Sequence, residues 1–353
     1  MPDVMPVALL DPTWLQTVWF LLWTLLWAVY FMLDGFDFGL GTLMPFMARN
    51  DLERRIMYNA SGPFWDGNEV WLITAGGVTF AAFPKAYATL FSALYAPLLM
   101  LLFALIFRAV AFEFRNKVDS PKWRKFWDIC KFFGSFVPAL LLGVAFANLF
   151  QGIPIDGEGV YHGNLLKLLS PYGLMGGVFF VLMFAHHGAL WLAVKSAGPL
   201  HDRAVAWSRT LWLLLLAAAV LFLGATAVFT NIYASIIQTP PLAVFPILAV
   251  LLLLASRFAR AGTYLAWLAH AGFIVCVTFF GVLGMYPAMI PSSLSQAYSV
   301  TAMNAAASPT TLKIMLVVVI IFVPLVIAYQ VFVYVLFRKK ITAEDLQRQS
   351  DLY

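Results

Sequence analysis

Five charged side chains interrupt long apolar stretches in the first third of the sequence, where they could bind or transfer protons. They are Asp34, Asp37, Asp66, Glu69 and Arg108. Ionisable groups inside membrane-spanning segments are costly to bury, so each is a candidate functional residue. A carboxyl that titrates near neutral pH beside an aqueous face is what a proton-entry route requires. A purely structural ion pair with Arg108 is the alternative that the residues leave open.

Asp66 is the acid that the sequence favours as the functional one. Trp65 and Trp71 flank it, and apolar sequence continues beyond it. A carboxyl in such surroundings needs a partner or a proton. Glu69 lies three residues further on and shares its helix face. We therefore expect Asp66 to relay protons, with Glu69 beside it and Arg108 tuning both.

Asp34 and Asp37 follow about 20 apolar residues, which is enough to cross the hydrocarbon core. They therefore belong near the cytoplasmic end of their helix. We expect them to form a water-facing approach to Asp66 from the cytoplasm. The residues also fit a simpler interpretation, in which Asp37 and Glu113 are interface residues whose side chains reach headgroup water.

Three histidines and two cysteines lie within apolar stretches: His186, His187, His270, Cys130 and Cys276. Imidazole is a common axial ligand of haem iron. However, the histidines have no companion His or Met set at matching depths, and the chain contains no Cys-x-x-Cys-His motif. A lone membrane histidine more often forms a hydrogen bond between helices. We expect neither metal nor haem on this chain, and no disulfide.

The composition excludes most soluble proteins. Of the 353 residues, 62% are hydrophobic and 11% are charged, and the mean hydropathy is +0.86. Soluble domains carry about 25% charged residues, so lipid must be the solvent of this chain. Its net charge of +5 comes from short basic clusters between apolar runs. Such clusters suit loops that face anionic lipid, and they exclude nucleic acid as a partner.

Nine segments are long and apolar enough to cross a membrane. They lie near residues 14–47, 62–83, 87–113, 126–151, 169–195, 206–230, 242–257, 262–288 and 311–337. The second is the weakest because it opens with five residues, 65–69, of which three are polar or charged. The sequence thus predicts an all-α polytopic membrane protein with one transmembrane domain, residues 1–340, and a cytoplasmic tail, residues 341–353.

The distribution of basic residues gives these helices an orientation. Alternate connections are rich in Lys and Arg: Arg49, Arg54, Arg55; Arg115, Lys117, Lys122, Arg124, Lys125, Lys131; Lys195, Arg203, Arg209; Arg257, Arg260; Arg338, Lys339, Lys340, Arg348. The other connections hold Lys85, Lys167 and Lys313. By the positive-inside rule the N-terminus is periplasmic and the C-terminus cytoplasmic, in a bacterial inner membrane. No basic segment precedes the first apolar run, so we expect the first helix to be retained.

Several motifs run in a fixed order from end to end. They are Asp34–Gly39 (DGFDFG), Arg49–Arg55 (RNDLERR), Trp65–Gly77 (WDGNEVWLITAGG), Phe107-Arg108, Gly134–Pro138 (GSFVP), Gly143–Phe146 with Asn148, Pro291–Ser293 (PSS) and the Ile341–Tyr353 tail. In these motifs the chain resembles subunit II of the cytochrome bd oxidase family along essentially its whole length. Membrane sequence would not produce the DGFDFG and WDGNEVWL stretches by chance.

The resemblance implies a haem-free subunit of a quinol oxidase, which reduces dioxygen to water with cytoplasmic protons. Subunit I of that family carries two haems b, one haem d and the quinol-oxidising loop. Subunit II forms a pseudosymmetric heterodimer with it, and each has two four-helix bundles plus one peripheral helix. Asp66 matches the family position on a proton route, and Trp71 lies in the region linked to oxygen access. The resemblance leaves open whether a small accessory subunit or a structural quinone is bound.

A proton-coupled secondary transporter is the alternative function. It would use Asp34, Asp66, Glu69 and Arg108 as its coupling site. Transporters often combine broken helices at the bilayer midplane with inverted internal repeats. The charges here cluster toward the cytoplasmic end and no such repeat is visible, so the motifs favour the oxidase subunit.

Overall fold

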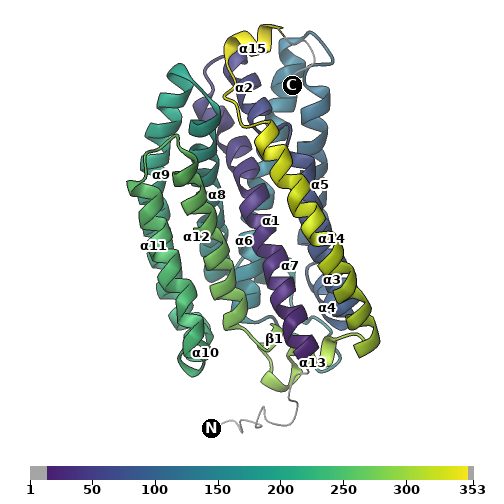
Figure 1. Ribbon diagram of the computed structural model, residues 1–353. Helices are drawn as coiled ribbons and strands as arrows, with labels where there is room; N and C mark the ends of the chain where they lie inside the picture. The colour runs from purple at the N-terminus through teal and green to yellow at the C-terminus, as the bar shows by residue number, and fades with distance from the viewer. Residues whose placement is uncertain (1–13, 349–353) are drawn as a thin grey trace.

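The computed structural model describes residues 14–348 as a bundle of long helices (Figure 1). Its elements are α1 (Trp14–Met47), α2 (Asp51–Ser61), α3 (Trp65–Ala82), α4 (Pro84–Ala93), α5 (Tyr95–Phe114), α6 (Pro121–Gln151), α7 (Leu165–Leu168), α8 (Pro171–Lys195), α9 (Gly198–Phe229), α10 (Ile232–Gln238), η2 (Pro240–Ala243), α11 (Val244–Phe258), α12 (Tyr264–Gly284), β1 (Ala288–Ile290), η3 (Gln296–Tyr298), β2 (Val300–Thr301), α13 (Ala302–Ala305), α14 (Pro309–Leu336) and α15 (Ala343–Arg348). The predicted helical membrane fold is confirmed. Residues 349–353 of the predicted tail lie outside the described residues.

Eight helices within residues 14–348 are long and apolar enough to cross a membrane: α1, α5, α6, α8, α9, η2 with α11, α12 and α14. Helix α3 corresponds to the second predicted span, but the polar residues in its first two turns lower its hydropathy. Several helices also begin earlier than predicted. Helix α9 starts at residue 198 and α6 at residue 121, because a hydropathy pattern detects only the part of a helix that lies in lipid.

The third predicted span, 87–113, is wrong as one helix. The structure divides it into α4 and α5 at Leu94. Pro97 explains the break, since a proline ring clashes with the carbonyl four residues earlier, here that of Ala93. Elsewhere Ser-Pro pairs start helices: the hydroxyls of Ser170 and Ser308 cap α8 and α14, and a proline follows in the first turn.

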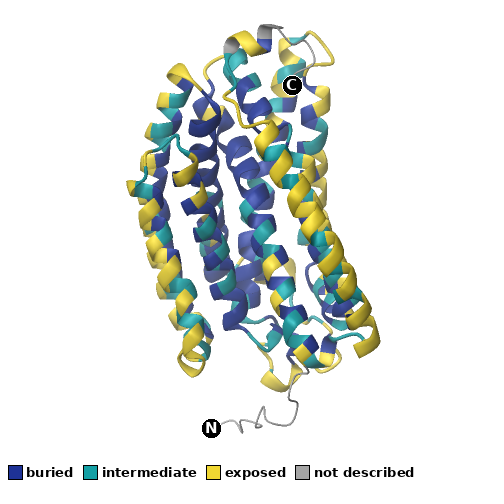
Figure 2. Cartoon of the chain, in the orientation of Figure 1, coloured by how far each residue is buried: buried dark blue, intermediate teal, exposed yellow. Residues whose placement is uncertain are grey.

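Helices α1 and α8 form the centre of the bundle. Helix α1 packs against α3, α6, α8, α12 and α14, and α8 packs against α6, α9 and α12. Buried residues concentrate on these central helices (Figure 2). The closest approach is at Gly39 of α1, where an added Cβ would overlap the carbonyl oxygen of Phe184 and lie 2.8 Å from the backbone nitrogen of Gly188. The DGFDFG motif therefore has a packing role.

Helix α14 lies on the outside of the bundle, and Leu312 is its only buried residue. Hydrogen bonds at its two ends fix the position of α14. The carbonyl of Leu312 accepts a hydrogen bond from the Trp19 indole, 3.0 Å away. At the opposite end Lys195 donates to the carbonyls of Phe337 and Lys339, which is favourable at a helix C-terminus.

The two longest connections, near residues 152–168 and 289–310, pack against each other at the end where α1 begins. The backbone nitrogen of Ile153 donates to the carbonyl of Pro291 at 3.0 Å, and that of Ser293 donates to the carbonyl of Ile153 at 3.0 Å. Within the second connection, strands β1 and β2 pair in an antiparallel manner. These contacts close one end of the bundle without a separate domain.

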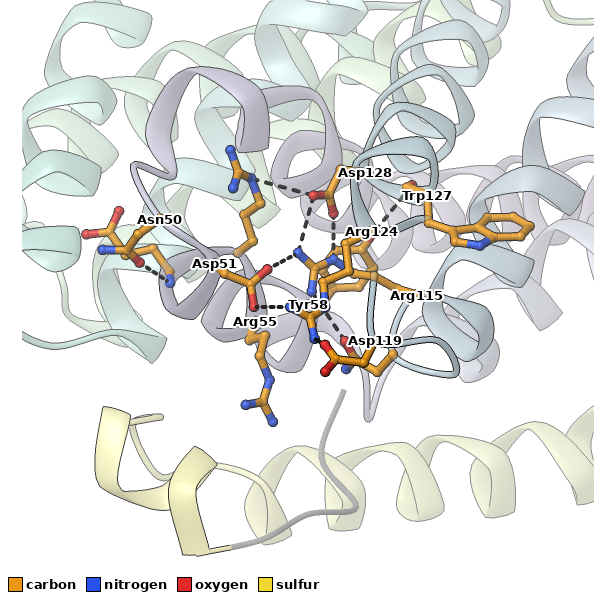
Figure 3. A network of polar contacts seen from close by, with 12 residues as sticks. Asn50, Asp51, Arg55, Tyr58, Arg115, Asp119, Arg124, Trp127 and Asp128 are labelled. Atoms are coloured by element: carbon orange, nitrogen blue, oxygen red, sulfur yellow. Dashed lines mark hydrogen bonds and ion pairs between the residues drawn. The ribbon is translucent and has the colours of Figure 1, made fainter. Parts of the chain in front are cut away.

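A network around Arg115 closes the opposite end (Figure 3). Arg115 is almost fully buried, and its guanidinium lies 2.6 Å from carboxylate oxygens of both Asp51 and Asp128. It thereby joins α2, α5 and α6. Burial opposes the ionisation of Asp51, but the hydrogen bond and charge of Arg115 outweigh this effect and hold the pKa of Asp51 below its usual value.

The Gly39→Ala substitution should destabilise the protein by about 3 kcal/mol, because the new methyl group would force α1 away from α8. Gly224→Ala is the matched control, since an added Cβ at that position of α9 meets nothing within 4 Å. Thermal unfolding in detergent should show a large decrease in Tm for the first variant and none for the second. Equal Tm values would contradict the close helix contact.

The Arg115→Gln substitution should cost about 3 kcal/mol, because it leaves two carboxylates without their buried cation. Arg124→Gln, which breaks a surface ion pair with the exposed Asp119 and a longer, 4.0 Å contact with Asp51, should cost less than about 1 kcal/mol. The ionised Asp51 contributes at neutral pH, and its contribution is lost as the pH falls through its lowered pKa. The Tm difference between wild type and Arg115→Gln should therefore shrink in acid. A difference that grows in acid would contradict this assignment.

Candidate functional site

A buried ion-pair cluster joins α1, α3 and α5. Nη2 of Arg108 lies 2.9 Å from both carboxylate oxygens of Asp34 and 2.5 Å from Oε1 of Glu69. Arg108 and Asp34 are fully buried, whereas the Glu69 side chain is 20% exposed. The guanidinium carbon also lies 4.4 Å from the ring centroid of Phe38, a cation–π distance. The Arg108 guanidinium thus forms ion pairs with carboxylates from two other helices.

A second set of polar contacts, beginning at Asp37 about one turn after Asp34 on α1, leads to the outside helix α14. Nδ2 of Asn68 donates to Oδ2 of Asp37 at 3.3 Å and to the carbonyl of Leu33 at 3.0 Å. Gln330 of α14 donates to Asn68 at 3.2 Å and accepts from the Trp71 indole at 2.8 Å. Trp71, predicted to lie near the oxygen route, therefore helps to fix α14 in this structure.

Lys131, expected in a cytoplasmic connection, is instead a buried cation of α6. Its side chain is 2% exposed, and Nζ lies 3.3 Å from the ring centroid of Phe112. Among the described residues Nζ has no hydrogen-bond partner, and the same holds for Oδ1 of Asp37, Oγ of Ser135, and Nε and Nη1 of Arg108. Buried polar groups usually have partners, often ordered water. So many open positions in one region indicate a polar interior that can hold water.

Burial reverses two expectations about the acids. The interpretation of Asp37 as a headgroup-interface residue is wrong, because its side chain is fully buried, whereas Glu113 is exposed. Asp66 is exposed in this chain. Trp65 stacks on Phe112 with ring centroids 5.1 Å apart and does not cover the carboxyl, because adjacent helical positions point about 100° apart.

The expected tuning of Asp66 by Arg108 is likewise not what the structure shows. The ion pairs of Arg108 are with Asp34 and Glu69. Of the five predicted residues, the structure thus brings together Asp34, Glu69 and Arg108. It places Asp37 about one turn further along α1, in contact with Asn68, and leaves Asp66 at the surface of α3. Spacing along α3 predicted the common face of Asp66 and Glu69, but it could not show which acid points inward.

The three histidines are not isolated. Nδ1 of His270 lies 3.1 Å from Nδ1 of His187, whose Nε2 lies 3.0 Å from the carbonyl of Met32. The rings of His186 and His270 have centroids 4.5 Å apart. The expectation of lone histidines is wrong, although they do connect helices α1, α8 and α12. Within residues 14–348, no group of three or more His, Cys, Asp or Glu side chains is arranged to hold a metal ion.

Sequence reasoning missed Lys131, Asn68 and Gln330 as members of this site. Lys131 was grouped with loop cations, although Cys130 and two phenylalanines surround it in sequence, which was the available signal. Asn68 lies inside the WDGNEVWL motif. Gln330 is a polar amide in a long apolar stretch of α14, residues 314–336, a position that often marks hydrogen bonding between helices.

Comparisons with known proteins agree with this architecture. Residues 15–337 match the family described as cytochrome bd terminal oxidase subunit II. The chain is 37% identical over 334 residues to cytochrome bd ubiquinol oxidase subunit 2 of Bacillus subtilis, covering 94% of this chain and 98% of that protein. It is 35% identical over 377 residues to cytochrome bd-I ubiquinol oxidase subunit 2 of Escherichia coli K12, covering 97% and 99%.

The fold also has a counterpart among solved structures. A chain of the bd oxidase from Geobacillus thermodenitrificans superposes with a TM-score of 0.75 at 16% identity, covering 92% of this chain and 98% of that one. At this identity the likeness shows the fold alone. Together with the relatives, which match nearly end to end, it leads to one conclusion: the chain belongs to the cytochrome bd terminal oxidase subunit II family, and is thus a membrane subunit of an oxidoreductase complex that also contains a subunit I.

Proposed function

We propose that this chain is the haem-free subunit of a quinol:oxygen oxidoreductase in the bacterial inner membrane. It supports a haem-bearing subunit I and supplies a proton route from the cytoplasm and oxygen access near Trp71. The observation that carries the proposal is the buried cluster of Asp34, Glu69 and Arg108 with Asp37 and Lys131 nearby. Family membership favours this function over the alternative of a proton-coupled transporter.

Protons enter at Asp66 in this proposal. Asp66 is exposed in the first turn of α3, and Glu69 lies about one turn deeper with its side chain partly exposed. Glu69 contacts Arg108, which contacts the fully buried Asp34. A proton can therefore pass from the surface to the interior through side chains on α3 and α1, with water in the open positions. The roles that we expected for Asp66 and for the pair Asp34 and Asp37 are thus exchanged.

The outer faces of α3 and α14 form the docking surface for subunit I. Ile73 and Phe80 of α3 are 73% and 61% exposed, and most residues of α14 are exposed. Exposed apolar surface alone would suit lipid, but here it surrounds polar side chains of α3, Asp66 among them, which lipid cannot satisfy. A protein partner satisfies both. We also propose that α3 is the ninth crossing and that the helices form two four-helix bundles plus α14.

The orientation of the chain follows from its basic residues. Helix α1 begins at one end of the bundle and α14 finishes at the other (Figure 1). The Arg115 network and the clusters around residues 195–209 and 257–260 share the end where α14 finishes. We assign that end to the cytoplasm because basic residues are retained on that side.

The Asp66→Asn substitution should slow oxygen reduction by about 100-fold, the lower limit for removal of a positioned proton-transfer group. Yield and haem content of the complex should stay normal, because asparagine keeps the shape and most of the hydrogen-bonding capacity of Asp66 at the docking surface and removes only the proton. Asp119→Asn, which changes a surface carboxylate away from the cluster, should leave turnover unchanged. Oxygen consumption by the purified complex, normalised to haem, measures both. A loss of yield or haem with normal turnover of the remaining complex would show a structural role instead.

A further inference from the structure

A cavity of about 540 Å³ lies between the ends of α8, α9 and α11, on the far side of the bundle from α14 (Figure 1). Residues from the first turns of α9, the last turn of α11 and the connection to α12 line it. It is separate from the ion-pair cluster on α1, α3 and α5, and from the proposed docking surface for subunit I. No step of the proposed proton route uses it.

The cavity is strongly basic. Arg209, Arg257 and Arg260 line it, and none of the three has an ion-pair partner among the described residues. One acid, Asp202, also lines it and is exposed. Three cations against one anion leave an excess positive charge that attracts an anionic ligand. Arginine matches phosphate geometry especially well, since its guanidinium can donate two parallel hydrogen bonds.

His186 is a second and independent sign of a missing ligand. It lines the cavity and is 2% exposed, yet neither ring nitrogen has a hydrogen-bond partner among residues 14–348. The backbone of Ser208 lies near the ring, but this contact is too poorly aligned to satisfy either ring nitrogen. A buried imidazole without a partner is unfavourable. A ligand oxygen in the cavity would supply the partner.

The surroundings of the cavity indicate an amphiphilic ligand. The outer faces of α9 and α11 next to it are apolar and exposed, including Leu213, Leu251 and Leu254. Arg257 lies over the Trp212 ring, 5.8 Å from its centroid, which directs the guanidinium along the cavity wall. Basic pockets between helices on the cytoplasmic side of a membrane bind anionic lipid head groups. The flanking apolar faces would accommodate the acyl chains.

We propose that this cavity binds the phosphate of an anionic phospholipid. The arginines bind the phosphate oxygens, His186 contacts the head group from the buried side, and the acyl chains follow α9 and α11. A free phosphate ion shares the same chemistry but would gain nothing from the apolar faces.

The test uses the purified oxidase complex in phosphatidylcholine nanodiscs, with phosphatidylglycerol or inorganic phosphate added in separate titrations. Native mass spectrometry gives the number and affinity of bound anionic lipids. In the Arg209→Gln/Arg257→Gln variant, the affinity of one site for phosphatidylglycerol should fall about 25-fold, or about fivefold for each arginine removed. The matched control Lys339→Gln/Lys340→Gln removes two exposed cations from the same end and should retain the site.

A third variant keeps the proposal testable if the arginine variant is unstable. Asp202→Asn removes the one acid of the cavity and should tighten phosphatidylglycerol binding several-fold. Equal lipid binding in wild type, the arginine variant and Asp202→Asn would overturn the site. Arginine-dependent binding of inorganic phosphate with the same affinity as the lipid would show a soluble anion as the ligand and overturn the lipid assignment.

Discussion

The sharing of one buried guanidinium between two helices is the interaction on which the inner half of this protein depends. Arg108 on α5 is fully buried and lies between Asp34 on α1 and Glu69 on α3. Removal of a charge from water costs several kcal/mol unless a partner is held at close range. The three helices must therefore keep one relative position, and a shift of α3 would remove one of the two carboxylate partners of the buried cation. Asp37 and Lys131 extend the same constraint toward α6.

This constraint also explains why the interior can serve proton transfer. Packed apolar cores exclude water, whereas a region with several unsatisfied polar atoms cannot be dry. The open positions around Arg108, Asp37 and Lys131 sit beside a cluster with more carboxylates than nearby cations can fully satisfy. Helices α1 and α8 stabilise this region, because their close contact at Gly39 and Gly188 fixes the surrounding backbone. The polar region is thus supported by a rigid apolar neighbour.

The sequence predicted the helical class, most spans and three members of the buried cluster. These follow from hydropathy, from helix spacing and from the cost of charge in lipid, which are local properties. The assignment of Asp66 as the desolvated acid failed because neighbouring tryptophans in sequence point to other sides of α3. Lys131 and Gln330 were missed because their burial depends on helices far away in the chain. The contact among His186, His187 and His270 likewise requires α8 and α12 to pack, which no short-range pattern encodes.

Helix α14 illustrates how a weakly packed element can still be placed accurately. Few of its apolar side chains are buried against the bundle. However, Leu312, Gln330 and Phe337 each take part in a hydrogen bond to a different helix. These three positions span almost the whole helix. A slide by a single residue would move every one of them by about 1.5 Å along the axis and rotate them by about 100°. All three bonds would break together, so the helix has one permitted register, and the surface that it presents to a neighbour is fixed in height as well as in direction.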